Sequence, residues 1–272
     1  MSEFELPVRP AVLTQALTRR FGELVAVDRL DLEIASGIIF GLLGPNGAGK
    51  STTVKMLTTL LPPSSGRATV AGHDVVREPA AVRRQIGYVP QLISADGALS
   101  GYENLLLSAK LYDVPRKEQA ARIDDALQFM GLTDAARAMV RTYSGGMVRR
   151  LEVAQALLHR PAVLFLDEPT IGLDPMARHA VWERLRESRT RYAMTVLITT
   201  HDMDEAEQLC DRLAIMNGGR LAATGTVAEL KQRVGPSATL DDVFAHFAVG
   251  VITEGGSYRD VVNTRNTAER LG

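Results

Sequence analysis

The chain has 272 residues, of which 46% are hydrophobic and 23% charged, so it can bury a substantial core and is not a disordered polymer. Its 31 lysines and arginines nearly balance 32 aspartates and glutamates, and this net charge of −1 argues against a nucleic-acid partner. The single cysteine excludes an internal disulfide, and the five histidines are too scattered for a histidine metal site.

No apolar run approaches the roughly 20 residues that cross a bilayer, and the acidic N-terminus lacks the hydrophobic core of a secretion signal. We therefore expect the chain to stay in the reducing cytoplasm and to reach a membrane only by binding a membrane protein. Two prolines in the first ten residues predict a loose N-terminal arm.

The first third of the chain predicts a strand-rich region. Residues 12–19 and 25–34 have strand patterns. In the second, the alternation of apolar and polar residues breaks at Asp28 and Arg29, and this slip predicts a β-bulge. Residues 38–43 are continuously apolar and end before glycine, which is typical of a buried parallel strand. The next expected elements are a helix at 50–60, a turn at 62–66, strands at 68–70 and 86–89, and a helix at 80–84.

The middle of the chain predicts a helical insert in an α/β core. From residue 101 to about 139 the pattern is helical, and Pro115 and Gly131 divide it. Strand and helix patterns then alternate, which predicts a mostly parallel sheet with helices on its faces. These elements are expected at 163–166, 175–190, 194–199, 203–209, 213–216, 220–223 after an Asn-Gly-Gly turn, 227–234 and 240–247, before a polar tail from residue 250.

The strongest motif is G-P-N-G-A-G-K-S at residues 44–51, which fits G-x-x-x-x-G-K-[ST] between a predicted strand and helix. Its glycines let backbone N–H groups face a polyphosphate, and the helix N-terminus adds its positive end. Lys50 is expected to reach the β- and γ-phosphates, and the Ser51 hydroxyl to ligate Mg²⁺. The predicted phosphate-binding residues are Gly44, Pro45, Asn46, Gly47, Ala48, Gly49, Lys50, Ser51 and Thr52.

A second motif places two carboxylates after the predicted strand at 163–166. In open α/β sheets the carboxyl ends of the strands border the ligand crevice. Asp167 is expected to hold Mg²⁺ through water, and Glu168 to polarise an attacking water as general base. An acidic cap at the end of a strand is the alternative, and the phosphate-loop motif makes it the weaker one.

Between these motifs, the segment Tyr143-Ser144-Gly145-Gly146-Met147 opens a predicted helix. The phosphate loop, this Ser-Gly-Gly and the Leu-Asp-Glu-Pro at 166–169 together resemble the ATP-binding subunits of ABC transporters, over about residues 11–235. The resemblance implies an α/β fold: a P-loop NTPase core with a mostly parallel sheet, an N-terminal antiparallel β subdomain and an inserted α-helical subdomain at about 90–160.

The resemblance also implies roles for single residues. Ser144, Gly145 and Gly146 resemble the signature motif, which binds the γ-phosphate of ATP held by a second subunit. Asp174 resembles the residue that crosses the dimer interface. Tyr143 and Met147 stand where the family usually has leucine and glutamine, and Met147 cannot make an amide contact.

Three further residues match positions of the family. Gln91 resembles the glutamine that contacts Mg²⁺ and water and joins the core to the helical insert. His201 resembles the switch histidine at the γ-phosphate, and Phe21 an aromatic residue that stacks on adenine. The alternatives are a surface glutamine, a histidine at the end of a strand and a core phenylalanine.

The narrower similarity is to daunorubicin/doxorubicin-resistance ATPases, which export drugs or secondary metabolites with a separate ABC-2 type membrane subunit. It implies ATP and Mg²⁺ as cofactors, a second copy of the subunit, a membrane permease, and a place on the inner face of the cell membrane. Residues 236–272 resemble that group's tail and are expected to contact the permease or the second copy. An importer ATPase, a non-transport ABC-type ATPase and a regulatory module that binds ATP without hydrolysis remain alternatives.

Overall fold

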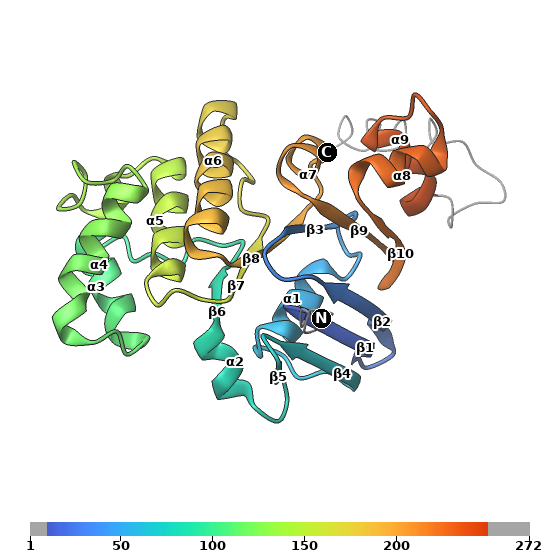
Figure 1. Cartoon of the computed structure of the whole chain (residues 1–272), viewed down its shortest axis with the longest axis horizontal. Coiled ribbons are helices and arrows are strands. Elements are labelled where there is room, and N and C mark those ends of the chain that lie inside the picture. Colours follow the sequence, from blue (N-terminus) through green and yellow to red (C-terminus); the bar gives the residue numbers. More distant parts are fainter. Residues whose placement is uncertain (1–9, 250–272) are drawn as a thin grey trace, which may run out of the picture.

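The structure, a computed structural model, describes residues 10–249. The predicted arm before residue 10 and the polar tail from residue 250 lie outside the described residues. Figure 1 shows two sheets side by side, with the helices of the predicted insert at one end of the molecule and α8 and α9 at the other.

The smaller sheet is antiparallel and has the order β2-β1-β4-β5. This arrangement confirms the predicted N-terminal β subdomain. Its strands are β1 (Val12–Phe21), β2 (Leu24–Ile34), β4 (Ser65–Val70) and β5 (His73–Asp74), of which β5 is too short to leave a sequence pattern.

The predicted bulge in β2 is confirmed. Between the cross-strand pairs Leu17–Leu30 and Arg19–Val27, β2 has one residue more than β1. Arg29 lies in this stretch with a left-handed φ of 48°, as the extra residue bends the strand.

The larger sheet has six strands in the order β10-β9-β3-β8-β7-β6. Neighbours from β9 to β6 are parallel, while β10 is antiparallel to β9 across the predicted Asn-Gly-Gly turn. The strands are β3 (Ile39–Leu43), β6 (Ile86–Val89), β7 (Val163–Asp167), β8 (Thr195–Thr200), β9 (Arg212–Asn217) and β10 (Arg220–Gly225).

The central strands are continuously apolar because both faces of the sheet are covered. Side chains alternate across a strand, so Leu164 and Leu166 pack into a core with the helical insert. Phe165 points the other way, into a core shared with the smaller sheet and α1. The strands are thereby held between two layers, and their ends are fixed in space.

The helices agree with the predicted pattern except at some ends. They are α1 (Lys50–Leu57), α2 (Pro79–Gln85), α3 (Gly101–Leu111), α4 (Arg116–Phe129), α5 (Gly145–Leu157), α6 (Pro175–Tyr192), α7 (Met203–Leu209), α8 (Val227–Val234) and α9 (Leu240–Phe244), which continues as a π-helix (Ala245–Val249). Within residues 10–249, none of these helices combines the length and apolarity that crossing a membrane requires.

Several expected boundaries differ from the structure, most of them by one to three residues, and three differences have a clear local cause or consequence. α1 stops at Leu57, because Thr59 takes a left-handed φ of 64° and the amides of Leu60 and Leu61 fold back to one carbonyl, that of Lys55. The expected turn at 62–66 is shorter, since β4 already begins at Ser65. The insert is not helical up to residue 139, and its α4 ends at Phe129 before a series of turns.

Candidate functional site

The site lies at the edge of the larger sheet where four parallel strands end. β3, β6, β7 and β8 run in the same direction, so their carboxyl ends meet at one edge. The residues that follow these ends come from four distant parts of the chain. They are Gly44, Gln91, Glu168 and His201.

The phosphate loop links β3 to α1, and its geometry requires glycine. Gly47 and Gly49 have φ angles of 82° and 101°, and a Cβ on Gly49 would lie 2.5 Å from the carbonyl oxygen of Ala26. The loop curls around the Lys50 side chain, whose Nζ donates to the carbonyls of Gly44 at 2.7 Å and Pro45 at 3.1 Å. The ammonium group is therefore fixed at the mouth of the loop.

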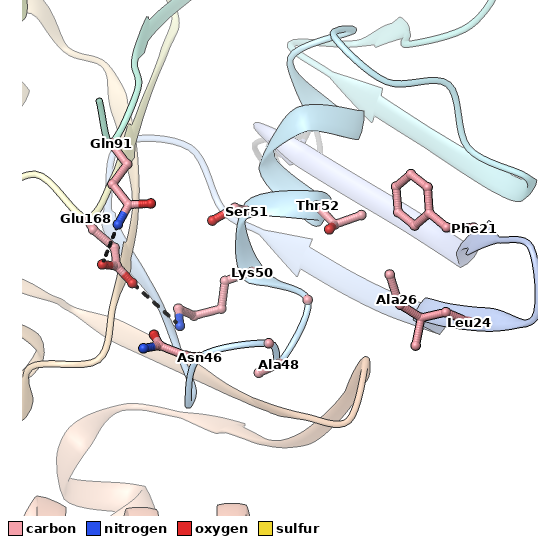
Figure 2. Close-up of a pocket in the computed structure, with 12 residues that line it drawn as sticks. Phe21, Leu24, Ala26, Asn46, Ala48, Lys50, Ser51, Thr52, Gln91 and Glu168 are labelled. Atoms are coloured by element: carbon pink, nitrogen blue, oxygen red, sulfur yellow. Dashed lines mark hydrogen bonds and ion pairs between the residues drawn. The ribbon is translucent and has the colours of Figure 1, made fainter. Parts of the chain in front are cut away.

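Glu168 is the centre of the polar cluster, as Figure 2 shows for its contacts with Lys50 and Gln91. Its Oε1 lies 3.8 Å from Lys50 Nζ and 3.2 Å from His201 Nδ1. Its Oε2 accepts a hydrogen bond of 3.3 Å from the Gln91 amide. The Glu168 side chain is only 8% exposed, so these contacts are screened little by solvent.

The backbone at Glu168 is held in an uncommon conformation. Its φ is 49°, in the left-handed region, and proline follows it. Its N–H donates both to the carbonyl of Thr199, at 3.1 Å, and to the hydroxyl of Thr199, at 3.0 Å. Such strain persists where the surroundings fix it, and here it turns the carboxylate out of the strand toward the loop.

Asp167 and Ser51 bring two oxygen ligands together beside the loop. The Ser51 hydroxyl donates to Asp167 Oδ1 at 3.0 Å, across from α1 to the end of β7. In residues 10–249 no three His, Cys, Asp or Glu side chains form a metal-binding group on their own. Oxygen donors from one hydroxyl and one carboxylate, completed by phosphates and water, are the pattern that Mg²⁺ prefers.

A pocket of about 460 Å³ runs from Glu168 along the phosphate loop to the smaller sheet. Figure 2 shows Phe21 at the end away from Glu168, with Leu24 and Ala26 near it. Phe21 is 46% exposed, so the alternative of a core residue is wrong. The Arg19 guanidinium lies 4.6 Å from the Phe21 ring centroid, and stacking of the ring on a base stays a prediction.

The electrostatics of Lys50 reflect this setting. Burial lowers the pKa of Lys50, since the charged form loses solvent, while Glu168 and Asp167 oppose that shift. An anionic ligand in the pocket would add a further partner for the ammonium group. The site is thus arranged to bind a polyanion at Lys50 beside a buried carboxylate.

The predicted signature residues lie elsewhere. Ser144 caps the N-terminus of α5 by accepting a hydrogen bond from the Met147 amide, and Gly145 and Gly146 begin the helix. Ser144 and Gly145 are exposed, and none of the three lines the pocket along the phosphate loop. Asp174 likewise caps α6 through the Ala177 amide and lies outside that pocket.

Sequence reasoning missed Thr199 and a buried network next to the site. Thr199 holds both Asp167 and Glu168, and its only signal was a polar residue in the apolar strand that pairs with Asp167. Behind it, the Glu205 carboxylate accepts hydrogen bonds from Thr170, at 2.7 Å, and Trp182, at 3.0 Å. This network ties the segment after Glu168 to α6 and α7.

Comparisons with known proteins identify the family. The sequence matches the family described as ABC transporter over residues 27–171. The daunorubicin resistance ATP-binding protein DrrA3 of Streptomyces coeruleorubidus is 47% identical over 225 residues, which cover 83% of this chain and 71% of that protein. The linearmycin resistance ATP-binding protein LnrL of Bacillus subtilis is 40% identical over 219 residues, 80% of this chain and 70% of that one.

A solved ATP-binding subunit of an ABC transporter has the same fold, with a TM-score of 0.78 and 29% identity over 87% of this chain and 99% of that one. The chain belongs to the ABC transporter family, as an ATP-binding ATPase subunit. The predicted family, its similarity to daunorubicin-resistance proteins and the predicted P-loop NTPase fold are thereby confirmed.

Lys50→Ala is expected to weaken ATP binding about ten- to a hundredfold, because a hydrogen bond to a charged group contributes about 1.5–3 kcal/mol. Isothermal titration with ATP and Mg²⁺ measures this change. The exposed Lys55 on the same helix supplies the control, and Lys55→Ala should bind as the wild type does. Normal affinity in Lys50→Ala would contradict the assigned contact.

Glu205→Gln is expected to change how stability depends on pH. Burial raises the pKa of the Glu205 carboxyl above its ordinary value of 4.5, although hydrogen bonds from Thr200, Thr170 and Trp182 oppose the shift. Glu205 therefore loses its proton at a lower pH in the unfolded chain than in the folded protein. As pH rises from 4.5 toward the folded-state pKa, the free energy of unfolding of wild type should fall relative to that of Glu205→Gln.

Urea unfolding of both proteins between pH 4 and 8 measures this difference. Glu183 is exposed on α6, and Glu183→Gln serves as the control. A stability difference between wild type and Glu205→Gln that stays constant over this range would show that the Glu205 pKa is not raised.

Proposed function

We propose that this subunit hydrolyses ATP between two copies of the chain and thereby powers export of a drug or secondary metabolite through a separate ABC-2 type membrane permease. The observation that carries the hydrolytic part is the Glu168 carboxylate, held between Lys50, Gln91 and His201 at the mouth of the phosphate loop. A module that only binds ATP has no need of this arrangement.

Glu168 acts as the general base of hydrolysis. Its carboxylate is buried and oriented by three side chains, so it can accept a proton from a water placed at the γ-phosphate. Lys50 neutralises phosphate charge, and Gln91 and His201 hold the two carboxylate oxygens until a nucleotide offers them new partners. These contacts make the same residues sensitive to whether a γ-phosphate is present.

Mg²⁺ fits the oxygen donors found beside the loop. Ser51 would ligate it directly, Asp167 would hold it through water, and Gln91 would contact the cation and its water. When bound, the cation neutralises charge on the β- and γ-phosphates. The hydroxyl already donates to the carboxylate, which places the Asp167 oxygen directly behind Ser51, a residue that lines the pocket.

A second copy of the chain is needed to complete the site. Ser144 and Gly145 are exposed at a helix N-terminus that lies outside the pocket of their own chain, and the buried Gly146 follows them. Helix N-termini bind phosphate, so this one can act on ATP held by the partner. Asp174 caps α6 beside the proposed interface. ATP would close the dimer, and hydrolysis would open it.

The permease is inferred from what the similar proteins are named for. Two relatives at 40–47% identity are named for resistance to different compounds, daunorubicin and linearmycin, so the cargo is a matter for the permease. We place the subunit on the inner face of the membrane, where the helical insert at about 90–160 passes the motion on. In this proposal residues 11–235 form the ATPase domain.

Residues 236–272 stay a proposed contact with the permease or the second copy. In the described part, Leu240 and Val243 of α9 are buried in a cluster with α7, β9 and α8. The described part of the segment, residues 236–249, is therefore part of the body of the protein. A contact with a partner is proposed for the remainder.

Glu168→Gln is expected to keep ATP binding but to lower turnover by at least about a hundredfold, because a general base contributes about 10²–10⁴-fold. It should also accumulate closed dimers with ATP, which size-exclusion chromatography detects. Turnover is measured as Mg²⁺-dependent phosphate release by Glu168→Gln, by wild type and by the control variant Glu183→Gln, which changes an exposed glutamate on α6. Unchanged turnover in Glu168→Gln would remove Glu168 as the base.

A further inference from the structure

The segment after β6 carries Gln91, yet its own side chains are mostly exposed. Leu92 and Ile93 are 82% and 66% exposed, and Ala95 packs against a hydrophobic core only at the far end of the segment, so apolar packing does little to hold the part near Gln91. Residues 90–95, here called the glutamine loop, belong to no helix or strand. Something else must keep the Gln91 amide 3.3 Å from Glu168.

Two buried side chains of α5 bind the backbone of the glutamine loop. The Arg149 guanidinium donates to the carbonyls of Pro90, at 2.8 Å, and Gln91, at 3.0 Å. Glu152 Oε1 accepts from the Ser94 amide and from the Ser94 hydroxyl, at 2.9 Å. The loop is therefore held at both ends by residues one helical turn apart.

These two residues also pair with each other. Arg149 Nη1 lies 3.0 Å from Glu152 Oε2, and the two residues are 5% and 2% exposed. A buried ion pair of this kind costs desolvation, and hydrogen bonds to further groups must offset it. Here those further groups are the carbonyls and amides of the glutamine loop.

α5 also lies very close to the strand that leads into this loop. A Cβ on Gly87 of β6 would stand 2.4 Å from the carbonyl oxygen of Ala156 on α5. The close approach brings Arg149 within reach of the end of β6. Helix α5, which Ser144 caps, is thereby fixed to the strand before Gln91 and to the loop that carries it.

We propose that Arg149 and Glu152 are positioning residues that hold Gln91 on Glu168 and make the glutamine loop move together with α5. This proposal rests on the proposed function, since it connects the two places where ATP would contact this chain and its partner. When Gln91 leaves Glu168 to contact a nucleotide, Arg149 and Glu152, here called the clamp, carry the movement of the glutamine loop to the N-terminus of α5. Neither residue touches the nucleotide pocket itself.

The test uses Arg149→Lys and Glu152→Ala in the full chain. Lysine keeps the charge of Arg149 but has a single nitrogen, so it cannot reproduce the fork in which Nη1 and Nη2 each reach a different carbonyl. Arg150 is the matched control, because it lies next in α5 and donates to a carbonyl outside the glutamine loop, that of Met130, at 2.9 Å. The readouts are kcat, KM for ATP, and hydrogen exchange of amides in the glutamine loop and in residues 144–148.

Both variants are expected to lower kcat about ten- to a hundredfold with KM within about twofold, because catalysis suffers when a group is misplaced by about 1 Å. The Ser94 amide should exchange faster, while the amides within α5 stay protected. Glu152→Ala leaves the buried Arg149 charge unpaired and lowers the thermal midpoint, so turnover and exchange are measured well below that midpoint. Glu152→Gln keeps one acceptor oxygen and should retain more of kcat than Glu152→Ala. Arg150→Lys should behave as wild type does.

A kcat within twofold of wild type in both Arg149→Lys and Glu152→Ala would overturn the proposal. Wild type without turnover, even with its membrane partner, would count against the proposed function instead. Hydrogen exchange then decides the clamp separately. ATP with Mg²⁺ should change exchange at the glutamine loop and at residues 144–148 together in wild type and not in Arg149→Lys. A joint change in both proteins would overturn the clamp.

Discussion

The contact between one buried carboxylate and its three partners is the constraint on which the rest of the site depends. Glu168 is almost fully enclosed, and a carboxylate removed from water is stable only where charge and hydrogen bonds replace solvent. Lys50, Gln91 and His201 supply these from three separate segments. They can converge because parallel strands deliver their carboxyl ends to one edge, and two hydrophobic cores hold those strands in place.

Much of the fold followed from local patterns. The apolar runs at β3 and β7 predicted buried parallel strands, because both faces of this sheet are covered, and the Asp28–Arg29 slip predicted the bulge found in β2. Helix ends were less predictable. The stop at Leu57 depends on a left-handed residue, Thr59, that no capping glycine or proline announces.

The site was predictable where one short motif carries the chemistry. Lys50, Ser51, Asp167 and Glu168 meet as their motifs indicate, and Gln91 and His201 reach Glu168. The supporting shell could not be predicted, since its members are ordinary residues brought together by strand register or by helix packing. Thr199 faces Asp167 only through pairing of β8 with β7, and Arg149 reaches the glutamine loop only because Gly87 lets α5 approach β6.

The most direct test of the account is a mixing experiment on ATP hydrolysis. Each proposed site combines Lys50 of one copy with Ser144 of the other. Lys50→Ala removes the phosphate contact of the first residue, and Ser144→Arg blocks the helix N-terminus at the second, so neither variant alone should turn ATP over. In an equal mixture, about half of the two-fold dimers contain one copy of each variant. One of the two sites in such a mixed dimer keeps both Lys50 and Ser144, so turnover should recover to about a quarter of wild type. Full turnover by Ser144→Arg alone, or a mixture no more active than its separate parts, would contradict a site shared between two copies.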